Sequence, residues 1–148
     1  MAIARETLDR LKAALGPKGW LEDPADAAPY CTAWREGWTG RTALVMRPAS
    51  TQEVAEVVRI CAETRTPIVP QTGNTGLTGG SQPHETGDEV LLSLARMTRV
   101  RAVDPLNDSL TVEAGVTLRQ VQEAAEAHDR LFPLSLAAEG SCGIGGNL

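Results

Sequence analysis

A run of glycines without charged side chains follows a short apolar stretch near the middle of the chain. The run extends from Pro70 to Ser81 and contains four glycines. Because glycine takes positive φ angles without steric cost, such a backbone can turn several amide N–H groups toward one point. A nest of amides binds an anion, most often a phosphate. The sequence therefore contains a candidate phosphate-binding loop.

A second glycine cluster extends from Gly140 to Asn147, after the apolar stretch Leu131–Leu134. The alternative interpretation is that both clusters are flexible connectors. A flexible linker would carry more Ser, Lys and Glu, whereas both clusters lack charge and are bordered by proline and apolar residues. The pair of clusters therefore favours a binding function.

The type of phosphate site follows from the glycine spacing. Gly80 and Ser81 come after Gly79 where a Walker A motif needs Lys-Ser/Thr, and no lysine occurs after Lys18. The first three glycines recur at every third residue, which departs from the G-x-G-x-x-G dinucleotide fingerprint, and no helical pattern follows them. The remaining candidate ligand is a diphosphate that is bound without being cleaved. Each charge-assisted N–H···O bond would contribute about 1.5–3 kcal/mol.

The first glycine loop is expected to leave a βαβ unit. Apolar runs at 42–47 and 68–69 predict strands, and Ser50 with Glu53 forms a capping box for a helix between them that ends near Thr64. The two strands of such a unit are parallel. The second strand then delivers the loop from its carboxyl end.

The N-terminal segment is expected to pack onto this unit. Leucine spacing predicts a surface helix over residues 2–15, and the prolines and glycines of residues 24–40 predict a loop. That loop holds an aromatic cluster of Tyr30, Trp34 and Trp38, which is expected to pack against the domain.

Three further strands and a helix are predicted after the first glycine loop. A strand is predicted at 89–94, and a β-hairpin is predicted from strands at 100–103 and 110–113 around a turn rich in Asp, Asn and Pro. Thr117 and Gln120 form a second capping box, which predicts a following helix.

Composition excludes several classes of protein. A net charge of −5 over 148 residues argues against a nucleic-acid surface. Three widely spaced cysteines and two histidines argue against a disulfide framework and a metal site, so no metal is expected. No apolar run is long enough to span a bilayer, and a cytoplasmic location is expected. Nothing in the sequence places Asp104, Glu113 or Glu139 near a substrate as a general base, so no catalytic residue is assigned.

Taken in order, these motifs resemble the first half of the PCMH-type FAD-binding domain, the fold of vanillyl-alcohol oxidase and p-cresol methylhydroxylase. Within that superfamily the chain is most similar to FAD-linked 2-hydroxy-acid dehydrogenases, which act on D-lactate, glycolate or D-2-hydroxyglutarate. The resemblance extends from about Tyr30 to the last residue. It is carried by Arg47-Pro48, residues 70–81, Val112–Val116, Phe132-Pro133-Leu134 and residues 140–147.

The resemblance implies an α+β fold: a small parallel βαβ subdomain, then the start of a second, mainly antiparallel subdomain. Residues 1–40 would form the N-terminal helix and packing segment. Residues 41–148 would form the N-terminal portion of the FAD-binding domain, which would be incomplete.

The resemblance also implies noncovalent FAD, because Thr75 stands where a histidine carries the flavin in covalent relatives. His84 is expected to be an exposed loop residue. Cys142 is expected to fill space beside the cofactor. The implied cofactor-binding residues are Pro70, Gln71, Thr72, Gly73, Asn74, Thr75, Gly76, Leu77, Gly79, Gly80, Ser81, Pro133, Leu134, Gly140, Ser141, Cys142, Gly145, Gly146 and Asn147.

The implied reaction is oxidation of a D-2-hydroxy acid by hydride transfer to flavin, with an electron acceptor that the sequence does not identify. In the family the substrate is bound by a further C-terminal region, and the whole enzyme can associate peripherally with a membrane. The chain is therefore expected to be an N-terminal fragment that binds FAD weakly or not at all and is inactive alone. Another PCMH-type oxidase or reductase, and a non-catalytic module that binds a phosphorylated ligand or a partner, remain alternatives.

Overall fold

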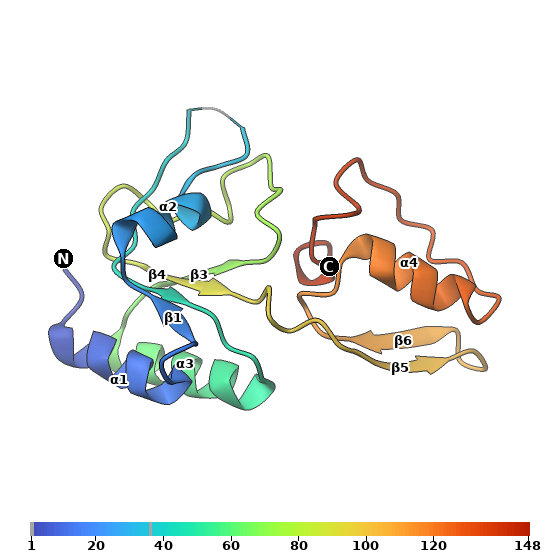
Figure 1. Ribbon diagram of the computed structural model, residues 1–148, viewed down its shortest axis with the longest axis horizontal. Helices are drawn as coiled ribbons and strands as arrows, with labels where there is room; N and C mark the ends of the chain where they lie inside the picture. The colour runs from blue at the N-terminus through green and yellow to red at the C-terminus, as the bar shows by residue number, and fades with distance from the viewer. Residues whose placement is uncertain (1, 36) are drawn as a thin grey trace.

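The structure is a computed structural model that describes residues 2–35 and 37–148, and it shows two parts side by side (Figure 1). The first part contains helices and a mixed sheet, and the second contains a hairpin and one helix. The first part comprises α1 (Arg5–Leu15), β1 (Trp20–Leu21), α2 (Pro24–Cys31), β2 (Val45–Met46), α3 (Thr51–Thr64), β3 (Ile68–Gln71) and β4 (Val90–Ser93). The second comprises β5 (Val100–Asp104), β6 (Ser109–Val112), α4 (Leu118–Glu126) and a 3-10 turn at Ile144–Gly146.

The first sheet has the strand order β1-β2-β4-β3. Strands β2 and β3 both run parallel to β4, which lies between them, and β1 is antiparallel to β2. The predicted βαβ unit is therefore confirmed, with β4 inserted between its two strands. The Ser50 hydroxyl accepts the N–H of Glu53, and the Glu53 carboxylate accepts the N–H of Ala49 at 2.7 Å, so α3 begins at its predicted cap.

The two faces of this sheet bury alternate residues, because successive side chains on a strand point to opposite sides. Met46 and Leu92 face α1 and α3, which cover one side of the sheet in Figure 1. Val45 and Leu91 face α2 on the other side, where they meet Ala27. All four strand residues are buried. The sheet is thus covered by helices on both faces. A ligand site is therefore expected at the loops that follow the strands.

The second part is an antiparallel hairpin with a helix packed on it. Strands β5 and β6 pair with a register irregularity between Val100 and Ala102. The capping box of α4 is present with both of its hydrogen bonds, as the sequence predicts. The core of this part consists of Val116, Leu118, Val121, Cys142 and Ile144. The mixed α+β architecture with a separate antiparallel sheet confirms the expected fold class.

The prediction of a loop over residues 24–40 is wrong in about its first half, where α2 forms. The Asp23 carboxylate accepts the N–H of Ala25, and Pro24 stands in the first turn, where a missing N–H costs nothing. Pro29 lies inside the helix. Burial of Ala27 and Cys31 against the sheet offsets the hydrogen bond that Pro29 removes.

Within residues 2–35 and 37–148 no helix is long and apolar enough to cross a membrane. The same residues contain no group of three or more His, Cys, Asp or Glu side chains arranged to hold a metal ion. The division of the chain at residue 40 stays a prediction.

Candidate functional site

The first glycine loop leaves the carboxyl end of β3, beside the second part of the molecule (Figure 1). From Thr72 to Ser81, no backbone N–H donates a hydrogen bond to an acceptor within the described residues. Three residues of this stretch take positive φ: Gly73 at 71°, Asn74 at 50° and Gly79 at 79°. Buried backbone donors in folded proteins are nearly always paired, so a row of unpaired N–H groups at a surface is suited to an external acceptor.

Side-chain amides hold this loop in place. Gln71 Nε2 donates to the carbonyl oxygens of Tyr30 and Ser81, both at 2.9 Å. Asn74 Nδ2 donates to the carbonyl oxygens of Pro29 and Thr32, at 3.1 and 3.0 Å. Because side chains rather than backbone groups make these contacts, the loop is ordered while its own N–H groups remain available.

The two glycine clusters contact each other directly. A Cβ placed on Gly73 would lie 3.0 Å from Cys142 Cα and from Gly143 N, and closer still to the carbonyl oxygen of Ser141. A Cβ placed on Gly143 would lie 2.7 Å from Thr72 Cγ2. Glycine at both positions is therefore what lets the backbones approach. The structure brings together the two clusters that the sequence identified separately.

The second cluster differs from the first in how its N–H groups are used. Among the N–H groups of residues 140–147, those of Gly140 and Gly143 are without an acceptor in the described part of the chain. The others hold the cluster to itself and to the segment before α4; Gly145, for example, donates to the carbonyl oxygen of Ala114 at 3.0 Å. The second cluster thus offers few free N–H donors. The first loop offers more of them to an anion.

The predicted site residues differ in exposure. Those of the first loop that are exposed are Pro70, Gly73, Gly76, Leu77 and Gly80; Gln71 is buried, and Thr72, Asn74, Thr75, Gly79 and Ser81 are half-buried. In the C-terminal set, Pro133, Gly140, Ser141, Gly145 and Gly146 are exposed, Leu134 and Asn147 are half-buried, and Cys142 is buried. Cys142 packs in the core of the second part, in agreement with a space-filling role.

His84 is an exposed loop residue, as expected. Its ring is 69% exposed, and Nδ1 lies 3.0 Å from Glu89 Oε1. The loop that carries it leads away from the glycines toward β4.

Two residues near the loop were not assigned from the sequence. Trp38 lies against Gly79, with ring atoms 3.6 Å from the position of a Cβ on that glycine. Gln82 is buried; its Nε2 donates to Asn74 Oδ1, and its Oε1 is a buried side-chain oxygen without a partner in the described chain. The expectation that the aromatic cluster packs against the domain is wrong for Trp34, which is 74% exposed.

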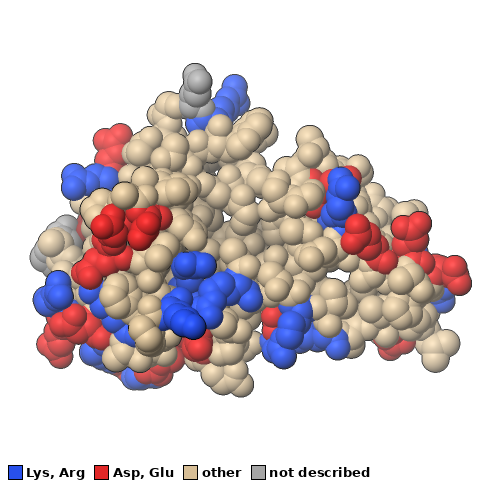
Figure 2. Space-filling model, in the orientation of Figure 1, with Lys and Arg blue, Asp and Glu red and all other residues tan. Residues whose placement is uncertain are grey.

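The surface around the site carries few charges. In Figure 2 a group of Lys and Arg side chains lies below and left of the centre, and the surface above the centre, where the two parts meet, is largely uncharged. An anion at this place would be held by backbone dipoles and not by ion pairs.

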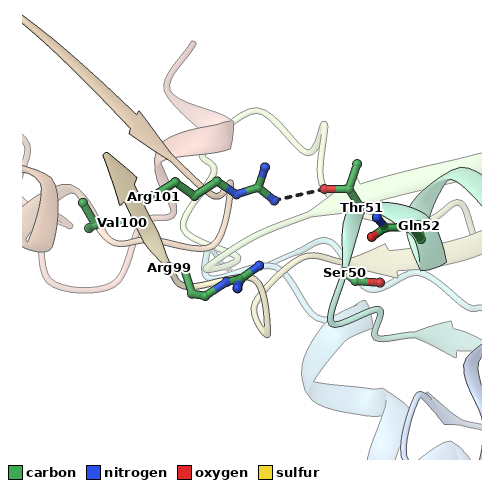
Figure 3. A pocket seen from close by; sticks show the side chains of 6 residues that line it. All are labelled: Ser50, Thr51, Gln52, Arg99, Val100 and Arg101. Atoms are coloured by element: carbon green, nitrogen blue, oxygen red, sulfur yellow. Dashed lines mark hydrogen bonds between the residues drawn. The ribbon is translucent and has the colours of Figure 1, made fainter. Parts of the chain in front are cut away.

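A separate cavity lies between the start of α3 and β5, lined by Ser50, Thr51, Gln52, Arg99, Val100 and Arg101 (Figure 3). Arg101 Nη2 donates to Thr51 Oγ1 at 3.1 Å and so joins the two parts. Arg99 and Arg101 also donate to the buried carboxylate of Glu113. This cavity is a structural joint away from the glycine loops.

Glu113 is ionised in this joint. The backbone N–H of Arg99 and the guanidinium groups of Arg101 and Arg99 lower the pKa of Glu113 to about 2, against the opposing effect of burial. Glu113 is ionised and paired with Arg99 and Arg101, so it is a structural anion and not a general base.

The stability of the chain should therefore depend on acid pH through Glu113. A pKa lowered on folding contributes stability above the ordinary carboxyl value of 4.5, and this contribution is lost as pH falls toward about 2. We expect Glu113→Gln to be less stable than wild type at neutral pH, and the difference to shrink over that acid range. Urea midpoints as a function of pH measure this, with the exposed Glu85→Gln as the matched control. A difference that stays constant down to about pH 2 would contradict the pairing.

A parallel unit with a glycine loop at a strand end, facing a second glycine cluster on an antiparallel unit, is the arrangement of a flavin-binding fold. Residues 42–148 match the family described as FAD binding domain, and the chain belongs to that family, in the PCMH-type superfamily. FAD is accordingly its cofactor.

Two relatives cover nearly all of the chain. A mitochondrial protein of Schizosaccharomyces pombe, provisionally named a D-lactate dehydrogenase, is 33% identical over 97% of this chain and 28% of its own length. The mitochondrial D-2-hydroxyglutarate dehydrogenase of Danio rerio is 36% identical over 99% of this chain and 27% of its own length. The chain thus spans about a quarter of the length of these relatives.

Solved structures share the fold. p-Cresol methylhydroxylase with bound substrate has a TM-score of 0.76 at 23% identity, over 96% of this chain and 28% of that chain. Alkyldihydroxyacetonephosphate synthase has a TM-score of 0.85 at 17% identity, over 97% of this chain and 28% of that chain.

The residues present fit the diphosphate of FAD. The unpaired N–H groups from Thr72 to Ser81 supply donors, and the close approach of the loop to the second cluster supplies a wall. The orphaned Gln82 Oε1 adds an acceptor within the same loop system.

Proposed function

We propose that this chain is the N-terminal, FAD-binding portion of a flavin-dependent dehydrogenase that oxidises a D-2-hydroxy acid of the lactate, glycolate or 2-hydroxyglutarate class. The observation that carries the proposal is the similarity, over nearly the whole chain, to proteins named as D-lactate and D-2-hydroxyglutarate dehydrogenases. Because the chain spans about a quarter of their length, the hydroxy acid would be bound by a region outside the part that they share with it.

In this proposal the backbone of Thr72 to Ser81 holds the FAD diphosphate, and Gln71 and Asn74 keep the loop in its receptive shape. The second cluster and Pro133-Leu134 border the ribityl and isoalloxazine end. Bound FAD would accept the hydride that leaves the carbon bearing the hydroxyl group. The residues of this chain orient the cofactor and exclude water from one side of it, and no residue of the chain is assigned to take the hydroxyl proton.

Thr75 supports noncovalent attachment, because a threonine hydroxyl forms no stable bond to the flavin ring. Acid precipitation of the flavin-loaded protein should therefore release all flavin into the supernatant. Flavin that remains with the precipitate would contradict noncovalent binding. A cytoplasmic location stays a prediction.

The diphosphate assignment is tested by competition. FAD is titrated into the 148-residue chain up to millimolar concentration, and flavin fluorescence is followed. We expect FAD and ADP to compete and inorganic pyrophosphate to displace both, with AMP weaker than ADP because it lacks one phosphate. Binding of inorganic pyrophosphate, measured by calorimetry, without any binding of FAD would favour the alternative of a module for a phosphorylated ligand.

The substrate class is tested with the protein expressed from the complete reading frame that contains these 148 codons. We expect reduction of an artificial electron acceptor with a D-2-hydroxy acid and little with its L-enantiomer. Turnover of a phenol or a sugar in place of hydroxy acids would favour another PCMH-type oxidase.

A further inference from the structure

We infer that Trp38 is a positioning residue for the diphosphate, which restrains the second half of the glycine loop. This inference rests on the proposed FAD binding. The side-chain braces Gln71 and Asn74 hold the loop at Asn74 and at Ser81, and Gly79 and Gly80 lie between these two points. The Trp38 ring lies beside this intervening segment.

The Trp38 ring lies next to Gly79, which has no side chain. Ring atoms Cδ2, Cε2 and Cε3 of Trp38 lie 3.6 Å from the position of a Cβ on Gly79, an ordinary van der Waals separation. Gly79 has a φ of 79°, which favours glycine. The indole therefore borders Gly79 with room for little more than a methyl group between them, and it limits how far the segment can move toward the ring.

Trp38 is itself anchored by backbone bonds. Its carbonyl oxygen accepts the N–H of Ala33 at 3.0 Å, and the adjacent Thr39 bridges to Thr32 in antiparallel fashion. The loop brace Asn74 Nδ2 binds the same segment through the carbonyl of Thr32. Trp38 thus belongs to a segment that is hydrogen-bonded to the loop at Asn74, and its ring lies beside Gly79.

Trp38 is only half-buried, at 48% exposed. A tryptophan that served the core alone would be buried on both faces. A half-exposed ring over an amide-rich loop instead restricts the N–H groups of the Gly79–Ser81 segment before the anion arrives. Restricting one backbone residue in advance is worth about a tenfold gain in affinity.

The test measures the FAD dissociation constant of the 148-residue chain for Trp38→Ala, Trp38→Phe and Trp34→Ala. We expect Trp38→Ala to weaken FAD binding by about tenfold, and Trp38→Phe to retain most of the affinity because it keeps a ring over Gly79. Trp34→Ala is the matched control, since Trp34 is an exposed tryptophan of the same segment. The thermal midpoint of the ligand-free chain should be nearly the same in all three variants.

A spectroscopic readout separates positioning from a general structural role. With Trp20 and Trp34 replaced by phenylalanine, Trp38 is the sole tryptophan, and inorganic pyrophosphate absorbs no tryptophan emission. We expect pyrophosphate to shift the emission of Trp38, and to leave unchanged a chain in which Trp34 is the sole tryptophan.

FAD binding that is equally tight in wild type and Trp38→Ala would overturn this inference and leave the proposed function intact. Loss of affinity that merely follows a fall in the thermal midpoint, without rescue by phenylalanine, would also overturn it. A wild-type chain that binds neither FAD nor pyrophosphate at millimolar concentration would overturn both proposals together.

Discussion

Gly73→Ala is expected to abolish measurable FAD binding and to lower the free energy of unfolding by about 3 kcal/mol, the sum of a left-handed alanine and an overpacked contact. Gly73 has a φ of 71°, and its Cβ would lie 3.0 Å from Cys142 Cα and Gly143 N. All neighbours at this point are backbone atoms, which cannot swing away as a long side chain can. The two glycine clusters would have to separate, and the site between the two parts would open.

Two glycines of the same chain isolate the two costs. Gly87 has the same φ of 71°, and its Cβ position meets only Arg41 Cβ at 3.7 Å, so Gly87→Ala tests conformational strain without overpacking. Gly80 has open space within 4 Å and no left-handed φ, so Gly80→Ala should leave stability nearly unchanged. Denaturant unfolding of the three variants gives the comparison. Gly73→Ala no more destabilised than Gly87→Ala would mean that the clusters do not touch.

Asn74→Ala is expected to weaken FAD binding by roughly tenfold to a hundredfold, because one or two loop residues would have to be ordered again on binding. The change removes two donors to the carbonyls of Pro29 and Thr32, and it places an alanine at a φ of 50°. It also deprives Gln82 Nε2 of its acceptor.

Asn107→Ala is the matched control for this change. Asn107 lies in the β5–β6 turn and binds Ser109 Oγ through its amide, away from the glycine loops. Equilibrium dialysis with FAD should give wild-type affinity for Asn107→Ala. Wild-type affinity for Asn74→Ala as well would refute the role of the side-chain brace.

The elements with strong local signals were predictable from the sequence. Helix α3 begins at Thr51 and ends at Thr64, where the capping residue and the apolar spacing place it. The capping box of α4 has both of its bonds, and the hairpin strands pair around the predicted turn. In each case the signal is local: one cap, one period or one turn.

The elements that depend on tertiary contacts were not predictable. Helix α2 contains Pro29, and it forms because Ala27 and Cys31 are buried against the sheet. Strand β1 has two residues and exists because Trp20 and Leu21 pair with β2. Neither contact leaves a periodic pattern in the sequence.

The glycine loop was predictable in position and not in its supports. Glycine spacing marks the loop, but the braces from Gln71 and Asn74 reach residues about 40 positions away in the chain. The contact of Trp38 with Gly79 also joins distant segments. Amide side chains and a tryptophan have many ordinary roles, so their identity alone gives no signal for this one.

The central claim is that the backbone N–H groups from Thr72 to Ser81 hold the cofactor diphosphate. Amide hydrogen exchange of this segment in the 148-residue chain, with and without saturating FAD, tests it most directly. These N–H groups have no acceptor in the described chain, so they should exchange rapidly without ligand and slow by about tenfold or more with FAD. Exchange that stays equally fast in this segment while flavin fluorescence reports bound FAD would contradict the claim.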